Sequence, residues 1–208
     1  MGHHESLPLG HTHFAEPEQV YHSAKFGMWV FLATEVHLFG ALFCTFAVYR
    51  WRYFEDFQQF ALSLNWRLGG LNTIVLLTSS YFMVRAVDAA QKGLNKKVNS
   101  FCNLTLLCAL TFLVVKFFEY RAKLILHEPP IFPHSHIFYG LYFTMTGIHG
   151  LHVLLGMGAI WWLKMRAKRE EFSVTYYTPV EVVGLYWHLV DVVWIYLFPL
   201  LYLLGGLA

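Results

Sequence analysis

Apolar residues of this chain gather in five long runs, with short polar segments between them. As a helix, each run is long enough to cross the roughly 30 Å hydrocarbon core of a membrane. The pattern therefore predicts an all-α, polytopic membrane bundle of five transmembrane helices over residues 23–208, preceded by a polar, His-rich tail over residues 1–22. The expected spans are about residues 26–49, 68–90, 100–120, 137–163 and 179–204.

The polar segments are expected to be connections between spans. Residues 50–67 form a polar connection after the first span, and three prolines predict a loop before the fourth, Pro129, Pro130 and Pro133. In the tail, His11 and His13 have a spacing that could bind a transition-metal ion. The alternative is that the tail is solvated, since nothing in the sequence fixes the geometry of these imidazoles.

The fourth run contains two imidazoles in an otherwise apolar stretch. At about 100° per residue, His149, His152 and Gly156 share one face of the helix. A second face carries glycines, on which we expect a neighbouring backbone to approach closely, Gly147, Gly150 and Gly158. Polar side chains in the hydrocarbon core are costly without partners. The other runs supply candidate partners for these histidines: Glu35, Glu119, Glu181, His188 and Asp191.

The first, third and fifth runs each contain acidic side chains, at different positions along the run. Glu35 lies near the middle of the first run, and His37 is about 200° away, so one of them faces lipid or a second protein. Glu119 lies three residues after Lys116 and four before Lys123, so it is expected to form an ion pair with either lysine at the membrane boundary. On the fifth run, three polar residues lie within about 80° of each other and form a stripe matching that of the fourth, Glu181, His188 and Asp191.

The composition supports a membrane protein, with 57% hydrophobic and 13% charged residues. A net charge of +2 gives no basis for a nucleic-acid partner. If the N-terminus is inside, the inner segments hold nine Lys and Arg residues and the outer ones six. The positive-inside rule then predicts a cytoplasmic N-terminus and an external C-terminus, in what we expect to be a bacterial plasma membrane.

Intramembrane histidines also raise the possibility of haem ligation. A bundle with two facing imidazoles can hold haem iron axially, and the candidate ligands are His37, His149, His152 and His188. A five-helix b-type cytochrome anchor is therefore an alternative to a bundle without a redox centre. No hydrolase or zinc-protease motif occurs, and the sequence predicts no metal site of its own.

Several strings of the chain resemble subunit III of the haem-copper terminal oxidases, the cytochrome c oxidase subunit 3 family, in its five-helix form. They occur in the order found in that family and cover about residues 23–204. The strings are F-L-A-T-E-V-H-L-F-G (31–40), L-N-T-I-V-L-L-T-S-S (71–80), K-F-F-E-Y (116–120), T-G-I-H-G-L-H-V-L-L-G (146–156) and Y-W-H-L-V-D-V-V-W (186–194).

The resemblance implies an accessory, non-catalytic subunit of a respiratory oxidase that contributes to aerobic electron transport and proton translocation. Such a subunit has no cofactor of its own. It packs directly on subunit I, which holds haem and copper, contacts other oxidase subunits, and binds structural phospholipid. A quinol oxidase or a nitric oxide reductase remains an alternative assembly.

The resemblance also assigns roles to individual residues. Glu35 matches the membrane-embedded, carbodiimide-reactive carboxylate that supports proton uptake, although a purely structural role stays open. Arg166 matches an arginine that contacts lipid phosphate. The remaining matched positions are expected to tie helices together: Glu119, His149, His152, Glu181, His188 and Asp191.

Overall fold

The computed structural model describes residues 17–62, 64–125 and 135–203, and within these residues the chain is helical and contains no strand. Five of its helices are long and apolar enough to cross a membrane, which confirms the predicted fold class. The elements are α1 (Pro17–Arg52), α2 (Phe54–Leu62), α3 (Trp66–Gln91), α4 (Asn95–Ile125), α5 (Ser135–Lys168), α6 (Thr178–Phe198) and the π-helical turn η1 (Pro199–Leu203).

Two boundaries differ from the sequence-based expectation. Helix α1 already begins at Pro17, so residues 17–22 of the expected tail are helical, while His11 and His13 lie outside the described residues. The expected connection over residues 50–67 contains α2. This helix buries Phe57, Phe60 and Ala61, an i, i+3, i+4 pattern that marks an amphipathic helix too short to span a membrane.

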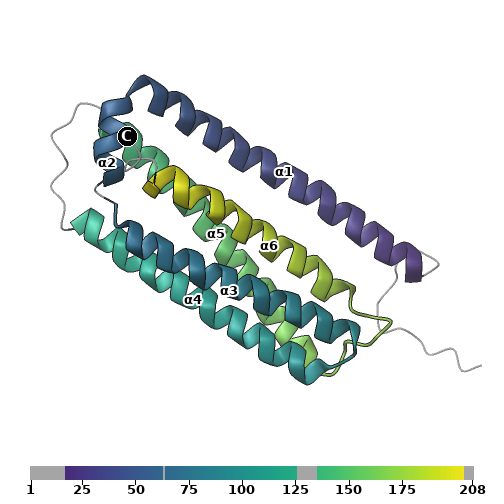
Figure 1. The fold of residues 1–208 in the computed structure, drawn as a ribbon. Coiled ribbons are helices and arrows are strands. Elements are labelled where there is room, and N and C mark those ends of the chain that lie inside the picture. The colour runs from purple at the N-terminus through teal and green to yellow at the C-terminus, as the bar shows by residue number, and fades with distance from the viewer. Residues whose placement is uncertain (1–16, 63, 126–134, 204–208) are drawn as a thin grey trace, which may run out of the picture.

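The long helices form one bundle in which α6 lies between α1 and the α3–α4 pair (Figure 1). Helix α5 packs against α4 and α6, and α1 lies at the edge of the bundle against α6 and α5. Gly93 makes the tight turn between α3 and α4 with a φ of +68°, which glycine adopts without strain. The Asn95 side chain then ties this turn to the α5–α6 connection, donating to the Phe172 carbonyl over 2.7 Å.

Two fully buried tryptophans of α6 fix its packing on α3. The indole N–H of Trp187 donates to the Ser79 hydroxyl over 3.0 Å, and that of Trp194 donates to Thr73 over 3.1 Å. These bonds satisfy the only polar atom of each indole, so its large apolar body can be buried without an orphaned donor. Polar residues of α3 therefore serve interhelical packing.

The glycines of α5 divide into a buried and an open set. A Cβ atom on Gly156 would lie 2.7 Å from the Trp187 ring, so α6 packs directly on this position. A Cβ atom on Gly147, Gly150 or Gly158 would meet nothing within 4 Å. The expectation of close approach along these three glycines is wrong for contacts within the chain, because α5 turns its histidine face, and not its glycine face, toward α6.

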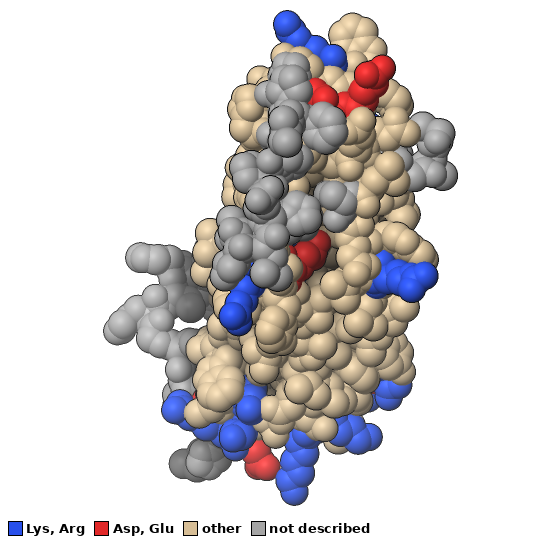
Figure 2. All heavy atoms as spheres, turned by 90° about the vertical axis from the view of Figure 1, so that its left-hand side faces the viewer, with Lys and Arg blue, Asp and Glu red and all other residues tan. Residues whose placement is uncertain are grey.

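Charged side chains occupy the ends of the bundle more than its middle. Figure 2 shows a broad uncharged surface, with Lys and Arg collected mainly toward one end. That end contains the α3–α4 turn and the end of α5, where the cationic residues are Lys92, Lys96, Lys97, Lys164, Arg166, Lys168 and Arg169. This distribution fits helices whose middles face hydrocarbon and whose ends reach polar headgroups.

Candidate functional site

Glu35 of α1 and His152 of α5 meet near the middle of their helices, where the edge helix α1 packs on α5. The His152 Nε2 atom lies 2.8 Å from Glu35 Oε2, and the two side chains are 12% and 13% exposed. Glu35 reaches α5 because it lies on the same side of α1 as the buried residues Leu32 and Phe39. The contact thus joins the edge helix to the bundle through two ionisable groups.

Hydrogen-bond chemistry defines the protons of this pair. His152 Nδ1 lies 2.8 Å from the carbonyl oxygen of Ile148, and a carbonyl can only accept, so Nδ1 carries a proton. The contact between Nε2 and Glu35 therefore holds one further proton, either on the carboxyl group or on the imidazole. The pair has zero net charge in both arrangements, either as two neutral groups or as a carboxylate paired with an imidazolium. A proton can move between Glu35 Oε2 and His152 Nε2 without a change in the net charge of the pair.

Aromatic residues surround His152. The Phe39 ring meets the imidazole edge-on, with the ring centres 5.3 Å apart. Tyr186 of α6 donates its hydroxyl to the His152 carbonyl over 3.0 Å and places its ring beside the imidazole. One turn later, Gly156 allows Trp187 to approach α5. These contacts fix the position of the imidazole while leaving Glu35 partly accessible at the surface of the bundle.

A second acid–base pair, Lys116 and Glu119, lies inside the bundle. Lys116 Nζ is 3.0 Å from Glu119 Oε2, and the two side chains are 10% and 5% exposed. The expected ion pair forms, but it does not snorkel toward the surface, because both side chains turn inward between α4, α5 and η1. Sequence spacing left Lys116 and Lys123 as possible partners of Glu119, and the structure shows that Lys116 forms the pair. The spacing also could not predict the rotation of α4 that buries this pair.

Two tyrosines complete this cluster. Tyr202 of η1 donates to Glu119 Oε1 over 2.6 Å, and Tyr142 of α5 donates to the same oxygen over 3.1 Å. The Lys116 ammonium donates to the Tyr202 hydroxyl over 2.6 Å and lies 4.8 Å from the centre of the Trp194 ring. Both charges are therefore hydrogen-bonded, and the cation also faces aromatic rings. The sequence analysis did not identify these tyrosines, for which no spacing signal exists.

The polar stripe expected on α6 does not face the histidines of α5. Glu181 binds α1 instead, with its carboxylate 2.7 Å from Lys25 Nζ and 3.2 Å from the Tyr21 hydroxyl. His188 binds α3 through a 2.7 Å contact between Nδ1 and the Ser80 hydroxyl. The predicted match between the two stripes is therefore wrong, because α6 contacts three helices and turns successive polar residues toward different ones.

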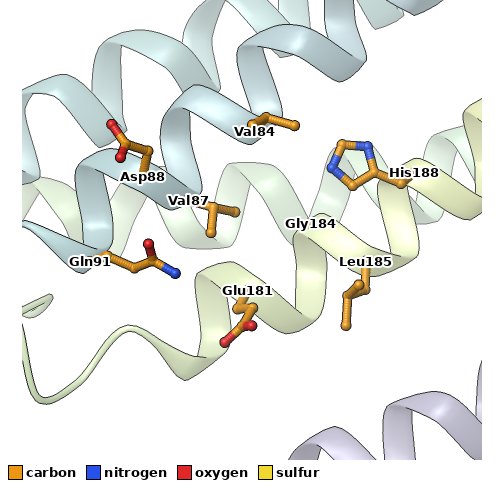
Figure 3. A pocket seen from close by; sticks show the side chains of 8 residues that line it. All are labelled: Val84, Val87, Asp88, Gln91, Glu181, Gly184, Leu185 and His188. Carbon is orange, nitrogen blue, oxygen red and sulfur yellow. The ribbon is translucent and has the colours of Figure 1, made fainter.

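Glu181 and His188 also line a pocket of about 280 Å³ between α3 and α6. Figure 3 shows the His188 ring turned toward α3 and the Glu181 carboxylate turned away from it. The α3 wall consists of Val84, Val87, Asp88 and Gln91. Asp88 is itself paired with Lys92 over 2.7 Å, so the acidic groups at this pocket already have cationic partners.

His149 and Asp191 are buried but have no hydrogen-bond partner among the described residues. The His149 ring packs between Phe112 and Trp194, with ring centres 5.6 and 5.4 Å away. The Asp191 carboxyl lies on the buried side of α6, near Ser80 of α3. Their expected role as ties between helices stays a prediction, since His149 contributes ring packing and Asp191 contributes no identified bond.

Arg166 lies near the end of α5, at the cationic end of the bundle. Its Nε atom donates to the Glu171 carboxylate, and its guanidinium lies within 6 Å of the centres of three aromatic rings, Trp162, Phe172 and Tyr176. The Nε bond leaves the terminal nitrogens of the guanidinium to other partners. Arg166 is thus held in place from one side, with 17% of its side chain exposed.

The four candidate haem ligands point in different directions. His152 is bound to Glu35 and His188 to Ser80, while His37 is exposed on α1 and His149 packs against aromatic rings. These positions provide no facing imidazole pair with room for a macrocycle, which disfavours the b-type cytochrome alternative. Among the described residues, no group of three or more His, Cys, Asp or Glu residues could hold a metal ion.

Comparisons with known proteins agree on one family. A sequence model described as cytochrome c oxidase subunit III matches residues 9–206. The cytochrome c oxidase subunit 3 of Synechocystis sp. is 31% identical over 195 residues, which cover 93% of this chain and 79% of that protein. The cytochrome c oxidase subunit 3 of Bacillus subtilis is 31% identical over 197 residues, which cover 92% of this chain and 92% of that protein. A heme-copper oxidase subunit I+III of Aeropyrum pernix is 31% identical over 96% of this chain and 24% of that longer protein.

Proposed function

This chain belongs to the cytochrome c oxidase subunit III family, and on that basis we propose that it binds subunit I of its oxidase directly and supports proton uptake there through Glu35. The membership confirms the family expected from the sequence, a multi-pass accessory subunit of a respiratory haem-copper oxidase. The Aeropyrum pernix relative, whose name joins subunits I and III in one chain, supports direct contact between the two. Haem and copper then belong to the partner subunit, and this chain contributes none of its own.

The Glu35–His152 contact is the observation that carries the proposal. It holds one exchangeable proton between two atoms 2.8 Å apart, in a pair whose net charge stays zero and whose side chains are still 12–13% exposed. A purely structural tie would need no second ionisable group, since an amide could form the same hydrogen bond. A carbodiimide reacts with an accessible carboxyl group in an apolar setting, and the Glu35 side chain is 13% exposed.

The test compares the assembled oxidase carrying wild-type, Glu35→Gln or Glu35→Ala chains. We expect both variants to retain the haem spectrum, to lose carbodiimide labelling at this position, and to slow proton uptake or shorten the working life of the enzyme during turnover. Wild-type proton uptake and wild-type lifetime in both variants would refute the proposed role of Glu35. Absence of a haem-bearing subunit from the purified assembly would refute the proposed function as a whole.

Phospholipid binding at Arg166 is part of the same proposal. Support comes from its position at the cationic end of α5 and from the aromatic rings and Glu171 that hold its guanidinium in place. A pre-positioned guanidinium suits a phosphate, which it can bind through two parallel hydrogen bonds. The exposed indole of Trp161, 4.5 Å from Lys164 Nζ, suits the same interfacial level.

We also propose that the N-terminus is cytoplasmic and Ala208 external. The argument is the excess of Lys and Arg at the end of the bundle that contains the α3–α4 turn and the end of α5. Reporter fusions or cysteine labelling at both ends of the chain test this orientation. A reporter that is active on the cytoplasmic side when fused after Ala208 would reverse the assignment.

A further inference from the structure

Helix α1 is the least covered of the five spans. Only 17% of its most apolar window is buried, against 28–39% in the other four spans. Its covered side is a narrow stripe at a spacing of seven residues, formed by Leu32, Phe39 and Phe46, and it faces α5 and α6. The opposite side meets no other part of the described chain, so it faces either lipid or another protein.

His37 lies at the centre of this open side. It is exposed and occupies the middle of α1, about 160° around the helix from Glu35 when measured the shorter way. An imidazole at this depth in contact with acyl chains alone is costly, so ionisable residues in spans nearly always face protein or water. Among the described residues, no other charged or imidazole side chain is exposed at the centre of a span.

The tautomer of His37 defines what it can bind. Its Nδ1 atom lies 2.7 Å from the Ala33 carbonyl oxygen, so Nδ1 carries the proton and donates within α1. The Nε2 atom of the neutral ring is then an acceptor that points away from the chain. Exposed hydroxyls elsewhere differ, since Thr78 and Thr111 donate to carbonyls of their own helices. Unlike the buried His149, His37 is exposed, and its Nε2 acceptor has no hydrogen-bond partner among the described residues.

Small residues surround His37 on the open side. Ala33, Ala41 and Cys44 lie on the same stripe and are exposed, and a Cβ atom on neighbouring Gly40 would meet nothing within 4 Å. Small residues let two membrane helices approach until a side chain on one can bond to the other. Acyl chains gain nothing from such a surface, and they offer no donor to Nε2. The occupant that fits is a helix.

We propose that the side of α1 centred on His37 docks against a membrane-spanning helix of subunit I, and that a hydrogen-bond donor on that helix binds His37 Nε2. The inference rests on the proposed function, which supplies subunit I as the partner in the same membrane. It adds to that function the face of this chain that makes the contact and the chemical nature of the group that recognises it.

Site-specific photocrosslinking in membranes that contain the whole oxidase tests the face. A photoreactive amino acid replaces Ala41 on the proposed face, and Leu110, which is 52% exposed on α4, serves as the matched control. We expect adducts with subunit I, identified by mass spectrometry, from position 41 and not from position 110. Adducts of position 41 with lipid only, or with a second copy of this chain, would overturn the proposal. If wild-type chains still copurify with the haem-bearing subunit in that case, the proposed function stands.

Two substitutions test the hydrogen bond. His37→Leu removes the acceptor, and His37→Gln replaces it with an amide oxygen. Because one interhelical hydrogen bond in a membrane contributes modestly, we expect His37→Leu to weaken retention of this chain on subunit I by about three- to tenfold in a detergent titration. His37→Gln should recover most of that loss, and Leu110→Ala should cause none. Retention equal to wild type for His37→Leu would overturn the hydrogen bond.

Discussion

The two acid–base pairs of the bundle are built in opposite ways. Lys116 and Glu119 lie three residues apart on one helix and are bonded to two tyrosines, and the Glu119 side chain is 5% exposed, against 13% for Glu35. Glu35 and His152 are 117 residues apart in the sequence and lie on different helices. They make one contact with each other and remain partly exposed. A fully bonded pair holds its charges in place, whereas a pair with one shared proton and an open side can exchange it. Under the proposed function, the Lys116–Glu119 pair therefore serves rigidity and the Glu35–His152 pair serves proton exchange.

The largest effect is expected from breaking the inner pair, Lys116 and Glu119. Lys116→Ala leaves the Glu119 carboxylate buried without its cation, which should cost about 3–5 kcal/mol of stability. Thermal unfolding of the assembled complex measures this loss, with the exposed Lys96→Ala as the control. The double variant Lys116→Met, Glu119→Leu should recover more than half, because it removes both charges. Equal melting temperatures for Lys116→Ala and Lys96→Ala would show that the cluster contributes no stability.

A smaller effect is expected from the packing that positions His152. Gly156→Ala places a Cβ atom 2.7 Å from the Trp187 ring and should cost about 1–3 kcal/mol through overpacking. Gly147→Ala adds a methyl group where nothing lies within 4 Å, so it should leave stability unchanged. Unfolding midpoints of the two variants measure the difference. Equal midpoints would mean that α5 and α6 can separate at Gly156 without loss.

The outer pair, Glu35 and His152, should respond differently to removal of the Glu35 side chain and to its replacement by an amide. Glu35→Ala leaves His152 Nε2 without a partner and should cost about 1–3 kcal/mol, whereas Glu35→Gln keeps a hydrogen bond and should cost less. Proton uptake should nevertheless be impaired in both, because neither side chain exchanges a proton. A Glu35→Gln oxidase with normal proton uptake, beside a destabilised Glu35→Ala oxidase, would make this pair structural like the inner one.

The smallest effect concerns lipid at the cationic end of the bundle. Arg166→Ala should release bound anionic phospholipid more readily than Lys168→Ala, since a guanidinium can hold a phosphate through two parallel bonds and an ammonium acts as a point charge. Lysine at position 168 is therefore a matched control on the same helix end. Native mass spectrometry measures the lipid retained by each variant. Equal retention would remove the special role assigned to Arg166.

The elements of the fold could be predicted because a membrane span is a local property. About 20 consecutive apolar residues suffice to define one, and all five spans were located from such runs. The short helix α2 was missed, although Phe57, Phe60 and Ala61 already have a helical spacing. In a chain dominated by long apolar runs, nine residues of mixed polarity are easily assigned to a connection.

The candidate site was predictable in its residues but not in its pairings. The sequence alone identified Glu35 and His152 as polar groups in need of partners, because an unpaired ionisable side chain in hydrocarbon is costly wherever the helix sits. Tertiary structure decided that these two bind each other, that Glu181 binds Lys25, and that Glu119 is buried by tyrosines from two other elements. Helical periodicity fixes which residues share a face of one helix. Only the packing of the helices sets how each is rotated and how deep it sits, and those two quantities determine which faces meet.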